Sequence, residues 1–268
     1  MRSVPIGKNR KGWKERMGKN LPSAASILPE GTTLTDFHSH ILPEMDDGSS
    51  SVGESLSMLE KLRESGVGRV IATPHFYARS ENPEGFFARR AESLARLREA
   101  LPPEAPEIVA GAELYYFDGV ESTECLPLFR VEGTSLLLLE MPFRRWTDRM
   151  VQDVLTINAR RGFRVILAHA ERYSAFGNAG DVRYLSESGV LIQANASWFE
   201  GTFARAAAFR AFEAGHIDVI GSDCHNLTTR APDLDSAYGQ LLRRYGAGTC
   251  LEFIGAENSI FEESKLSE

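Results

Sequence analysis

The stretch Asp36-Phe37-His38-Ser39-His40 places two histidines one residue apart, and Asp46-Asp47-Gly48 follows within ten positions. Side chains alternate between the two faces of an extended strand, so both imidazoles of such a pair lie on one face. Imidazoles and carboxylates presented together at a strand end are suitable ligands for a divalent metal ion. An isolated pair of this kind is more often a pair of surface histidines, so the interpretation depends on partners elsewhere in the chain.

Seven strand-like segments recur along the chain, and each is followed by a helix or a helical turn. The first strand is expected to begin at residue 33, and the others are expected at residues 67–73, 108–112, 135–139, 163–168, 190–194 and 217–221. Helices are expected at residues 51–65, 83–100, 147–161, 182–188, 203–214, 233–245 and 257–265. Strict alternation of strand and helix predicts parallel strands. Continuous apolar strands such as residues 136–139 predict burial on both faces of the sheet.

Metal-binding residue types stand at the carboxyl ends of six of these seven strands. They are His38, His40, His75, Glu113, Glu140, His169, Asp223 and His225. In a parallel barrel those ends converge on one mouth, where active sites lie. An open, doubly wound sheet would hold its outer strand ends too far apart for these residues to share ions. We therefore predict an α/β fold in which residues 33–268 form a single catalytic domain, a distorted parallel (β/α)7 barrel of the TIM type.

Together with Asp47, these positions supply five histidines and four carboxylates, more than the first coordination shell of one ion normally holds. Without cations between them, the groups would repel one another and lose their solvation. The economical interpretation is two or three divalent ions with at least one bridging carboxylate. Two ions about 3.5–4 Å apart lower the pKa of a water, orient it and neutralise a developing oxyanion, which suits hydrolysis.

Two arginines, Arg172 and Arg230, lie close in sequence to the predicted ligands. A guanidinium group matches the geometry of phosphate oxygens and binds them through paired hydrogen bonds. A single arginine is more often a surface ion-pair partner, but two beside the same mouth favour a phosphate substrate. The residues therefore predict a phosphate ester hydrolase in which Arg172 and Arg230 are catalytic.

The net charge of −7 conceals a basic N-terminal segment. Residues 1–20 hold seven lysines and arginines against a single glutamate, a net charge of +6, so the rest of the chain carries −13. An acidic body argues against nucleic-acid binding. Residues 1–32 are expected to form a flexible basic extension and linker. A solvated tail is the favoured interpretation, and any contact with a membrane surface would come through this segment.

The cysteine content and the absence of long apolar runs indicate a cytoplasmic protein. No apolar run approaches the roughly 20 residues of a membrane span, and the N-terminus lacks the apolar core of a secretory signal. The three cysteines, Cys125, Cys224 and Cys250, are too sparse for a disulfide framework. A reducing cytoplasm is therefore the expected location.

Six ordered motifs carry a resemblance to a known family. They are Asp36-Phe37-His38-Ser39-His40-Ile41-Leu42-Pro43, Ala72-Thr73-Pro74-His75, Gly111-Ala112-Glu113-Leu114-Tyr115-Tyr116, Leu139-Glu140-Met141-Pro142, Ala168-His169-Ala170-Glu171-Arg172-Tyr173 and Ser222-Asp223-Cys224-His225-Asn226-Leu227. Over residues 33–262 the chain resembles the PHP (polymerase and histidinol phosphatase) superfamily. Within it, the chain is similar to the metal-dependent tyrosine-protein phosphatases of bacterial capsule and exopolysaccharide operons. Its basic extension and Cys224, where methionine is common, depart from that branch.

The resemblance implies a trinuclear metal site and a protein phosphatase activity. One ion would be held by His38, His40, Glu113 and Asp223, a second by Glu113, Glu140 and His169, and a third by Asp47, His75 and His225. Manganese is the implied metal, with iron, zinc and magnesium as alternatives. The implied reaction is hydrolysis of phosphotyrosine by a metal-activated hydroxide. The implied substrate is the tyrosine-rich tail of a bacterial tyrosine kinase that regulates polysaccharide export.

Three alternatives stay open from the sequence. A histidinol phosphatase-like enzyme of the same superfamily would use the same ligands on a small phosphate ester. A non-catalytic regulator would bind phosphotyrosine without hydrolysing it. Residues 224–230 also fit the C-x5-R loop of cysteine-dependent tyrosine phosphatases, although no glycine stands between Cys224 and Arg230 to help the backbone cradle a phosphate.

Overall fold

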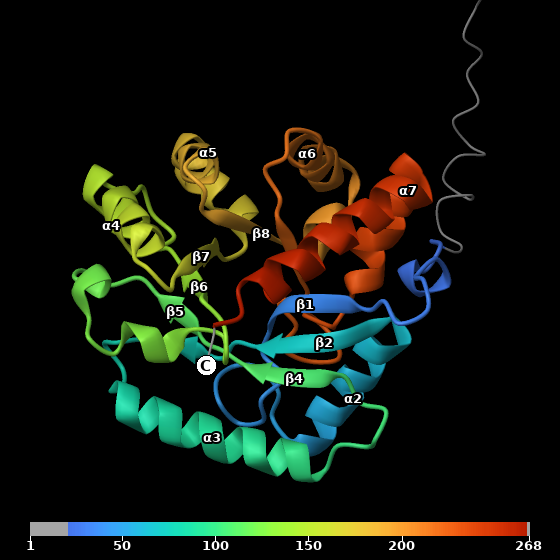
Figure 1. The fold of residues 1–268 in the computed structure, drawn as a ribbon, viewed down its shortest axis with the longest axis horizontal. Coiled ribbons are helices and arrows are strands. Elements are labelled where there is room, and N and C mark those ends of the chain that lie inside the picture. The colour runs from blue at the N-terminus through green and yellow to red at the C-terminus, as the bar shows by residue number, and fades with distance from the viewer. Residues whose placement is uncertain (1–20, 267–268) are drawn as a thin grey trace, which may run out of the picture.

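The protein, studied here as a computed structural model, is described over residues 21–266 (Figure 1). The strands are β1 Leu34–Ser39, β2 Val67–Ala72, β3 His75–Phe76, β4 Glu107–Ala110, β5 Glu113–Tyr115, β6 Leu136–Glu140, β7 Arg164–Leu167, β8 Leu191–Asn195 and β9 Val219–Gly221. The α-helices are α2 Val52–Glu64, α3 Pro83–Glu99, α4 Asp148–Ala159, α5 Ala179–Glu187, α6 Thr202–Glu213 and α7 Leu234–Glu263. Short 3-10 helices span Ala24–Ser26, Val120–Ser122, Leu126–Phe129, Ala170–Phe176 and Ala196–Phe199.

The named strands pair in parallel within two sheets. One sheet has the order β1-β2-β4, and the other has the order β3-β5-β6-β7-β8-β9. Every pairing of neighbouring named strands within these sheets is parallel. This confirms the parallel α/β class predicted from the alternation of strands and helices. Figure 1 shows the strands in the middle of the view, with the helices arranged around them.

The strands predicted at residues 67–73 and 108–112 correspond to β2 and β4, and each is followed, after a short break, by a further short strand that was not predicted. β2 and β3 are separated by Thr73-Pro74, and β4 and β5 by Gly111-Ala112. The same neighbours pair on both sides of these breaks, β2 with β4 and β3 with β5. Two backbone hydrogen bonds continue the ladder across the gap, since Gly111 N–H donates to Ala72 and Glu113 N–H donates to Pro74. Proline lacks the amide hydrogen that a regular ladder requires, which accounts for the break at Pro74.

The apolar residues divide into two separate clusters on opposite faces of the strands. The smaller cluster takes residues from seven strands and is closed by α7; its strand members are Phe37, Ile71, Val109, Leu136, Leu138, Ile166, Leu191 and Val219, and its α7 member is Phe261. The larger cluster packs the other strand faces against the helices. Both faces are therefore buried, as predicted for continuous apolar strands.

A register shift in β1 turns its histidines toward the other strand ends. Asp36 pairs with Val70 and Ser39 pairs with Ala72, so β1 contains one more residue than β2 over this interval. An extra residue of this kind reverses which side chains face each side of the sheet. Adjacent residues of a regular strand point to opposite faces, but the extra residue lets Phe37 and His38 face the same side. Phe37 joins the smaller apolar cluster, and His38 contacts the predicted ligands described below.

The helices begin where the sequence supplies capping groups. The Ser51 hydroxyl accepts the Glu54 N–H at the start of α2, and the Glu54 carboxylate accepts the Ser50 N–H in return, an arrangement similar to a capping box. Asn82 and Thr147 cap α3 and α4 in the same way. Among the helices of residues 21–266, none has the combination of length and apolar character that crossing a bilayer requires.

The C-terminal helices differ from the prediction. α7 consists of two helices joined by a kink at Gly246, so the first ends where the helix expected at residues 233–245 ends, and the second begins well before the expected residue 257. Gly246 has φ of 83°, a left-handed conformation that glycine adopts without strain. Helical structure therefore resumes directly after Gly246, because residues such as Cys250 and Ile254 pack into the larger core.

Residues 21–26 pack against α7. Ala24 is fully buried, and the Ser23 hydroxyl donates to the Asp235 carboxylate at 3.0 Å. The backbone of Pro22 approaches Gly239 so closely that a Cβ at residue 239 would lie 2.8 Å from the Pro22 carbonyl oxygen. The basic part of the predicted extension, residues 1–20, lies outside the described residues.

Glu257 on α7 should make stability depend on pH. Its carboxylate accepts hydrogen bonds from the Tyr238 hydroxyl and the Ile220 N–H, both at 2.7 Å, and burial raises the pKa of Glu257 from 4.5 to about 8. A carboxyl group whose pKa rises on folding stabilises the fold fully below its unfolded pKa and loses that contribution as pH rises through its folded pKa. We therefore expect wild-type Tm to fall relative to that of Glu257→Gln between about pH 5 and pH 8. Thermal unfolding of both proteins in chelator checks this, and parallel Tm profiles would contradict it.

Candidate metal centre

The nine predicted ligands come together at the carboxyl ends of the strands. β1 supplies one histidine, β3 and β5 each begin with a predicted ligand, β6 ends with one, and the segments after β1, β7 and β9 supply the rest. In chain order the predicted ligands are His38, His40, Asp47, His75, Glu113, Glu140, His169, Asp223 and His225. Seven of them are buried, whereas the Asp47 side chain is 67% exposed and His75 is partly exposed. The cluster is therefore a buried polar site with one open side.

Glu113 lies at the centre of this cluster. Its Oε2 atom is 3.2 Å from His38 Nε2 and 3.3 Å from His40 Nε2. The same oxygen is 2.9 Å from His75 Nδ1, and the other oxygen, Oε1, is 2.8 Å from His169 Nε2. One carboxylate thus contacts four imidazoles from three different strands or strand ends, which is the position a bridging ligand would occupy.

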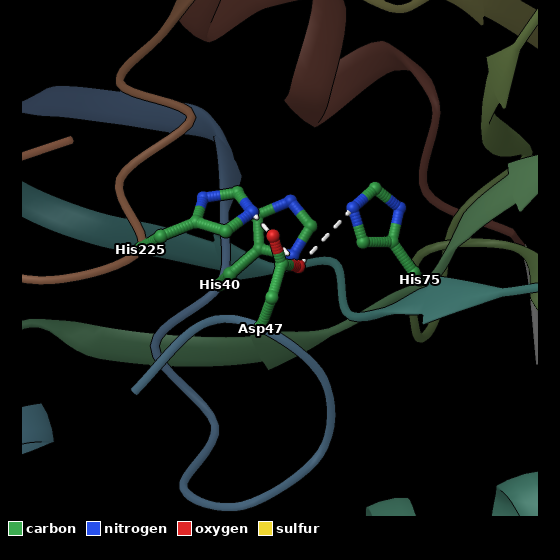
Figure 2. Close-up of side chains that lie close together, drawn as sticks. All are labelled: His40, Asp47, His75 and His225. Atoms are coloured by element: carbon green, nitrogen blue, oxygen red, sulfur yellow. Dashed lines mark ion pairs between the residues drawn. The ribbon is translucent and has the colours of Figure 1, made fainter. Parts of the chain in front are cut away.

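Asp47 joins two histidines on the exposed side of the cluster. Its Oδ1 atom is 3.4 Å from His225 Nε2 and 3.6 Å from His75 Nε2 (Figure 2). Figure 2 also shows the His40 ring between those two imidazoles, and its centroid is 3.8 Å from that of His225. Ligand atoms of these four residues all lie within 4.8 Å of one another.

Asp223 connects the histidines of β1 with the two predicted catalytic arginines. Its Oδ1 atom is 3.6 Å from His38 Nε2 and 3.5 Å from His40 Nε2. Arg230 donates to the same oxygen at 2.7 Å, and Arg172 donates to Oδ2. Both guanidinium groups remain about one-third exposed, so each has donors that face the open side of the cluster.

The unsatisfied polar atoms of the cluster fit bound cations. Among residues 21–266, seven buried side-chain nitrogen or oxygen atoms lack a partner with hydrogen-bond geometry, and five belong to predicted ligands: His75 Nδ1, Glu113 Oε2, Glu140 Oε2, His169 Nδ1 and His225 Nε2. The 2.9 Å approach of His75 Nδ1 to Glu113 Oε2 does not have that geometry. Leaving such atoms buried without partners costs about 1–3 kcal/mol each. Imidazole and carboxylate donors are also the groups that divalent transition metals take. The residues present therefore fit a multinuclear metal centre.

Comparison with known proteins places the chain in a family. The family model described as "Capsular polysaccharide synthesis, CpsB/CapC" matches residues 34–260. The chain belongs to the CpsB/CapC family. It is 30% identical over 227 residues to the tyrosine-protein phosphatase CpsB of Streptococcus pneumoniae, an alignment that covers 80% of this chain and 92% of that protein.

Two further comparisons agree with the CpsB/CapC assignment. The tyrosine-protein phosphatase YwqE of Bacillus subtilis is 27% identical over 222 residues, covering 80% of this chain and 86% of that one. A crystal structure from work on YwqE and S. pneumoniae CpsB, described there as unique metal-dependent tyrosine phosphatases, superposes with a TM-score of 0.74. That match has 24% sequence identity and covers 87% of this chain and 96% of the other, so the fold is shared.

Two predicted ligands of this CpsB/CapC member occupy strained backbone conformations. His169 has φ of 35° and Asp223 has φ of 52°, in the left-handed region that residues other than glycine seldom adopt. Strain of this kind costs about 1–3 kcal/mol per residue and persists where the surrounding structure enforces it. Each residue closely follows a short strand, β7 for His169 and β9 for Asp223. The turn directs the His169 side chain toward Glu113 and the Asp223 side chain toward His38.

The protonation states of the CpsB/CapC cluster are set by its own charges. Burial would lower the pKa of His40, but the Asp46 carboxylate, 2.8 Å away, raises it to about 10. Burial and the charge of His40 lower the pKa of His225 to about 3. Burial would raise the pKa of Glu113, yet His38 and His169 hold it well below its usual range. Protonated imidazoles thus compensate the carboxylates, and cations binding there would displace those protons.

Three supporting residues of the CpsB/CapC site were not assigned from the sequence. Asp46 contacts His40 Nδ1 and accepts the His75 N–H, each at 2.8 Å. Gln193 Oε1 lies 3.1 Å from His38 Nδ1 and accepts the His169 N–H at 2.6 Å. Asn195 donates to Asp223 at 2.7 Å. The two β8 residues are polar positions spaced two apart in an otherwise apolar strand, the same signal that identified the β1 histidines.

Cys224 is unsuited to be the nucleophile of this CpsB/CapC chain. Its side chain is fully buried, and burial raises the pKa of the thiol above its ordinary value. A cysteine nucleophile needs the opposite, a lowered pKa in an accessible, positive environment. The residue follows Asp223 within a backbone pairing with β1, where His40 N–H donates to the Cys224 carbonyl. The position therefore suits a small core side chain.

Proposed function

We propose that this chain is a metal-dependent protein-tyrosine phosphatase, a phosphoric monoester hydrolase of phosphotyrosine. The observation that carries the proposal is the cluster of predicted ligands with unsatisfied polar atoms around Glu113. It lies beside two arginines whose side chains are about one-third exposed. The names of CpsB and YwqE as tyrosine-protein phosphatases support the same substrate class. The proposed location is the cytoplasm, where a tyrosine kinase would present its phosphorylated tail.

We also infer that the two sheets form one distorted (β/α)7 barrel. Counting β2 with β3 and β4 with β5 gives seven strands, each paired with the next. The isolated parallel bridge between Ser39 and Cys224 connects β1 to the end of β9. The apolar cluster with members from seven strands is the interior that such a closed arrangement requires.

The proposed ligand sets are those implied by the family pattern. His38, His40, Glu113 and Asp223 would hold one ion; Glu113, Glu140 and His169 a second; and Asp47, His75 and His225 a third. Two or three bound divalent ions, with manganese proposed and iron, zinc or magnesium as alternatives, would supply an activated water and neutralise phosphoryl charge. Asp46, Gln193 and Asn195 would orient the ligands, since each forms a hydrogen bond with the side chain of a proposed ligand.

Arg172 and Arg230 would bind the phosphoryl oxygens. Each already donates one N–H to Asp223, and a guanidinium group has five donors in total. The remaining donors on the exposed side can orient a phosphate monoester beside the cluster. The tyrosyl leaving group has an ordinary pKa of about 10, so it needs less proton donation than an alkoxide would.

The substrate class is the point that most needs a direct test. Purified protein loaded with manganese should hydrolyse phosphotyrosine peptides with a higher kcat/KM than histidinol phosphate. Bound metal should be quantified in the same sample, and a His169→Ala variant serves as the control for a contaminating phosphatase. Faster turnover of histidinol phosphate would favour the small-molecule phosphatase alternative. Binding of phosphotyrosine without turnover by the metal-loaded protein would favour a regulator.

Replacing Asp47 with alanine should remove one ion from the site. Asp47 is the carboxylate between His75 and His225, and it does not contact Glu113. We expect the variant to bind about one metal equivalent less than wild type and to lose roughly 10- to 100-fold in kcat/KM. Elemental analysis and peptide kinetics measure both effects. Unchanged metal content would contradict the proposed third ligand set.

Replacing Cys224 with serine should leave most of the activity. The thiol is buried in the larger apolar core and carries no proposed role, so kcat should stay within about threefold of wild type. The buried hydroxyl should lower the free energy of unfolding by about 1–2 kcal/mol. Peptide kinetics at a temperature below the transition, together with a Tm measurement, check this. Complete loss of turnover in a folded, metal-loaded Cys224→Ser protein would revive the cysteine mechanism.

A further inference from the structure

A second cavity adjoins the metal centre, and neither of the two proposed phosphate-binding arginines lines it. It has a volume of about 290 Å³ and is lined in part by Tyr77, Arg79, Tyr115, Asp118 and Arg144. Arg172 and Arg230 line a different cavity of about 260 Å³ that shares no residue with the first. The proposed phosphate-binding groups therefore account for only one of the two cavities.

The second cavity is built on the strand ends that supply metal ligands. Tyr77 follows His75 by two residues, and Tyr115 follows Glu113 by two, while His75 and Glu113 are paired in the ladder. Alternation along a strand therefore carries the face that holds the ligands outward to the tyrosines. The Tyr77 ring centroid is 5.1 Å from that of His75 and 5.4 Å from that of Tyr115. A group in this cavity would lie next to the ligands.

The cavity carries an excess of positive charge that the protein does not neutralise. Within residues 21–266, neither Arg79 nor Arg144 has a carboxylate within the 4.0 Å of an ion pair. Other exposed arginines do, for example Arg96 with Glu44 and Arg145 with Asp181. Asp118 is the one acidic side chain that lines the cavity.

We propose that this cavity is a specificity subsite for an anionic side chain next to the phosphotyrosine that is hydrolysed. This rests on the proposed function and names a feature of its substrate. The volume is close to the lower end of ligand pockets, about 300 Å³, and suits one side chain. Two free guanidinium groups can bind a carboxylate or a second phosphate through charge-assisted hydrogen bonds, and the tyrosine rings supply the walls.

The preference should be visible in peptide kinetics. We would compare phosphotyrosine peptides that carry glutamate or glutamine at each of the two positions on either side of the phosphotyrosine, with a second phosphotyrosine as a further arm. At one or more positions, wild type should favour the glutamate peptide about tenfold in kcat/KM, and the ratio should shrink as salt is raised. The phosphotyrosine arm shows whether a phosphate is taken better than a carboxylate.

Charge variants then locate the preference. In Arg79→Ala/Arg144→Ala, the ratio of kcat/KM for the glutamate peptide to that for the glutamine peptide should fall to about one. In Arg79→Glu/Arg144→Glu, a peptide with lysine at that position should have a higher kcat/KM than the glutamate peptide. Arg145→Ala is the matched control, because it removes the same charge one residue from Arg144 without lining the cavity, and it should keep the wild-type ratio. An equal ratio in wild type, or a ratio that the double variant retains, overturns the proposal.

Two readouts separate this proposal from failure of the proposed function. If the cavity instead receives the reacting phosphotyrosine, the alanine variant should slow all peptides and p-nitrophenyl phosphate by the same factor, and the ratio would not change. If wild type hydrolyses no phosphate ester, binding of non-hydrolysable phosphonate peptides, measured by fluorescence anisotropy, still tests the subsite. Tighter binding of the glutamate peptide, lost in the double variant, supports the subsite, and equal binding overturns it.

Discussion

Glu113→Gln should lower kcat/KM for a phosphotyrosine peptide by about a thousandfold, which corresponds to about 4 kcal/mol of transition-state stabilisation. Glu113 contacts four imidazoles, through Oε2 to His38, His40 and His75 and through Oε1 to His169. Glutamine has nearly the same shape but lacks the charge, and its amide nitrogen donates where a ligand must accept. Two of the three proposed ions would lose their shared ligand.

The Glu113 prediction has a readout that does not depend on activity. Elemental analysis should show fewer bound metal ions in Glu113→Gln than in wild type, and added manganese should raise its Tm less. Glu257→Gln is a matched control, because it makes the same change in another buried glutamate that lies outside the cluster. A Glu113→Gln protein with wild-type metal content and wild-type turnover would contradict the central role of this carboxylate.

Removing the metal from wild-type protein should abolish phosphatase activity and lower stability at the same time. The carboxylates and imidazoles of the cluster leave five buried atoms without partners, so the metal-free protein bears their desolvation. An ion that binds only the folded state stabilises it by about 2.7 kcal/mol at a hundredfold excess over its Kd. We therefore expect chelation to reduce turnover to background and to lower Tm by several degrees.

The chelation experiment distinguishes metal chemistry from cysteine chemistry. Dialysis against a chelator, followed by addition of manganese, iron, zinc or magnesium, should restore turnover to different extents and thereby rank the metals. Treatment with a thiol-alkylating reagent should leave turnover unchanged, because Cys224 is fully buried. Activity that survives removal of all bound metal would overturn the proposed function, whatever the outcome for the thiol.

The sequence predicted the parallel α/β class and the positions of the seven main strands because both depend on local pattern. Apolar segments such as residues 136–139 and polar residues directly after them are readable without any tertiary information. The strand breaks at Thr73-Pro74 and Gly111-Ala112 were not predicted, and neither was the continuation of α7 beyond Gly246. These features depend on which segments pack together, since packing supports a helix or strand that propensity alone leaves undecided.

The chemical identity of the candidate site was already contained in the sequence. The pairing of His38 with His40, and the placement of Glu113 and Glu140 at strand ends, follow from the two-residue period of a strand and the order of elements. The motif His169-Ala170-Glu171-Arg172 added an arginine beside a ligand. These are local properties, and the structure brings the residues together.

Only the tertiary structure decided how those groups act on one another. It placed Glu113 at the centre of four imidazoles and buried Cys224. It also brought Gln193 into contact with two predicted ligands, His38 and His169. It also placed Arg79 and Arg144 beside a cavity, where neither forms an ion pair with a carboxylate of residues 21–266. The physical reason is that desolvation and Coulomb interactions depend on distances between residues far apart in the chain, which the local period of a strand does not specify.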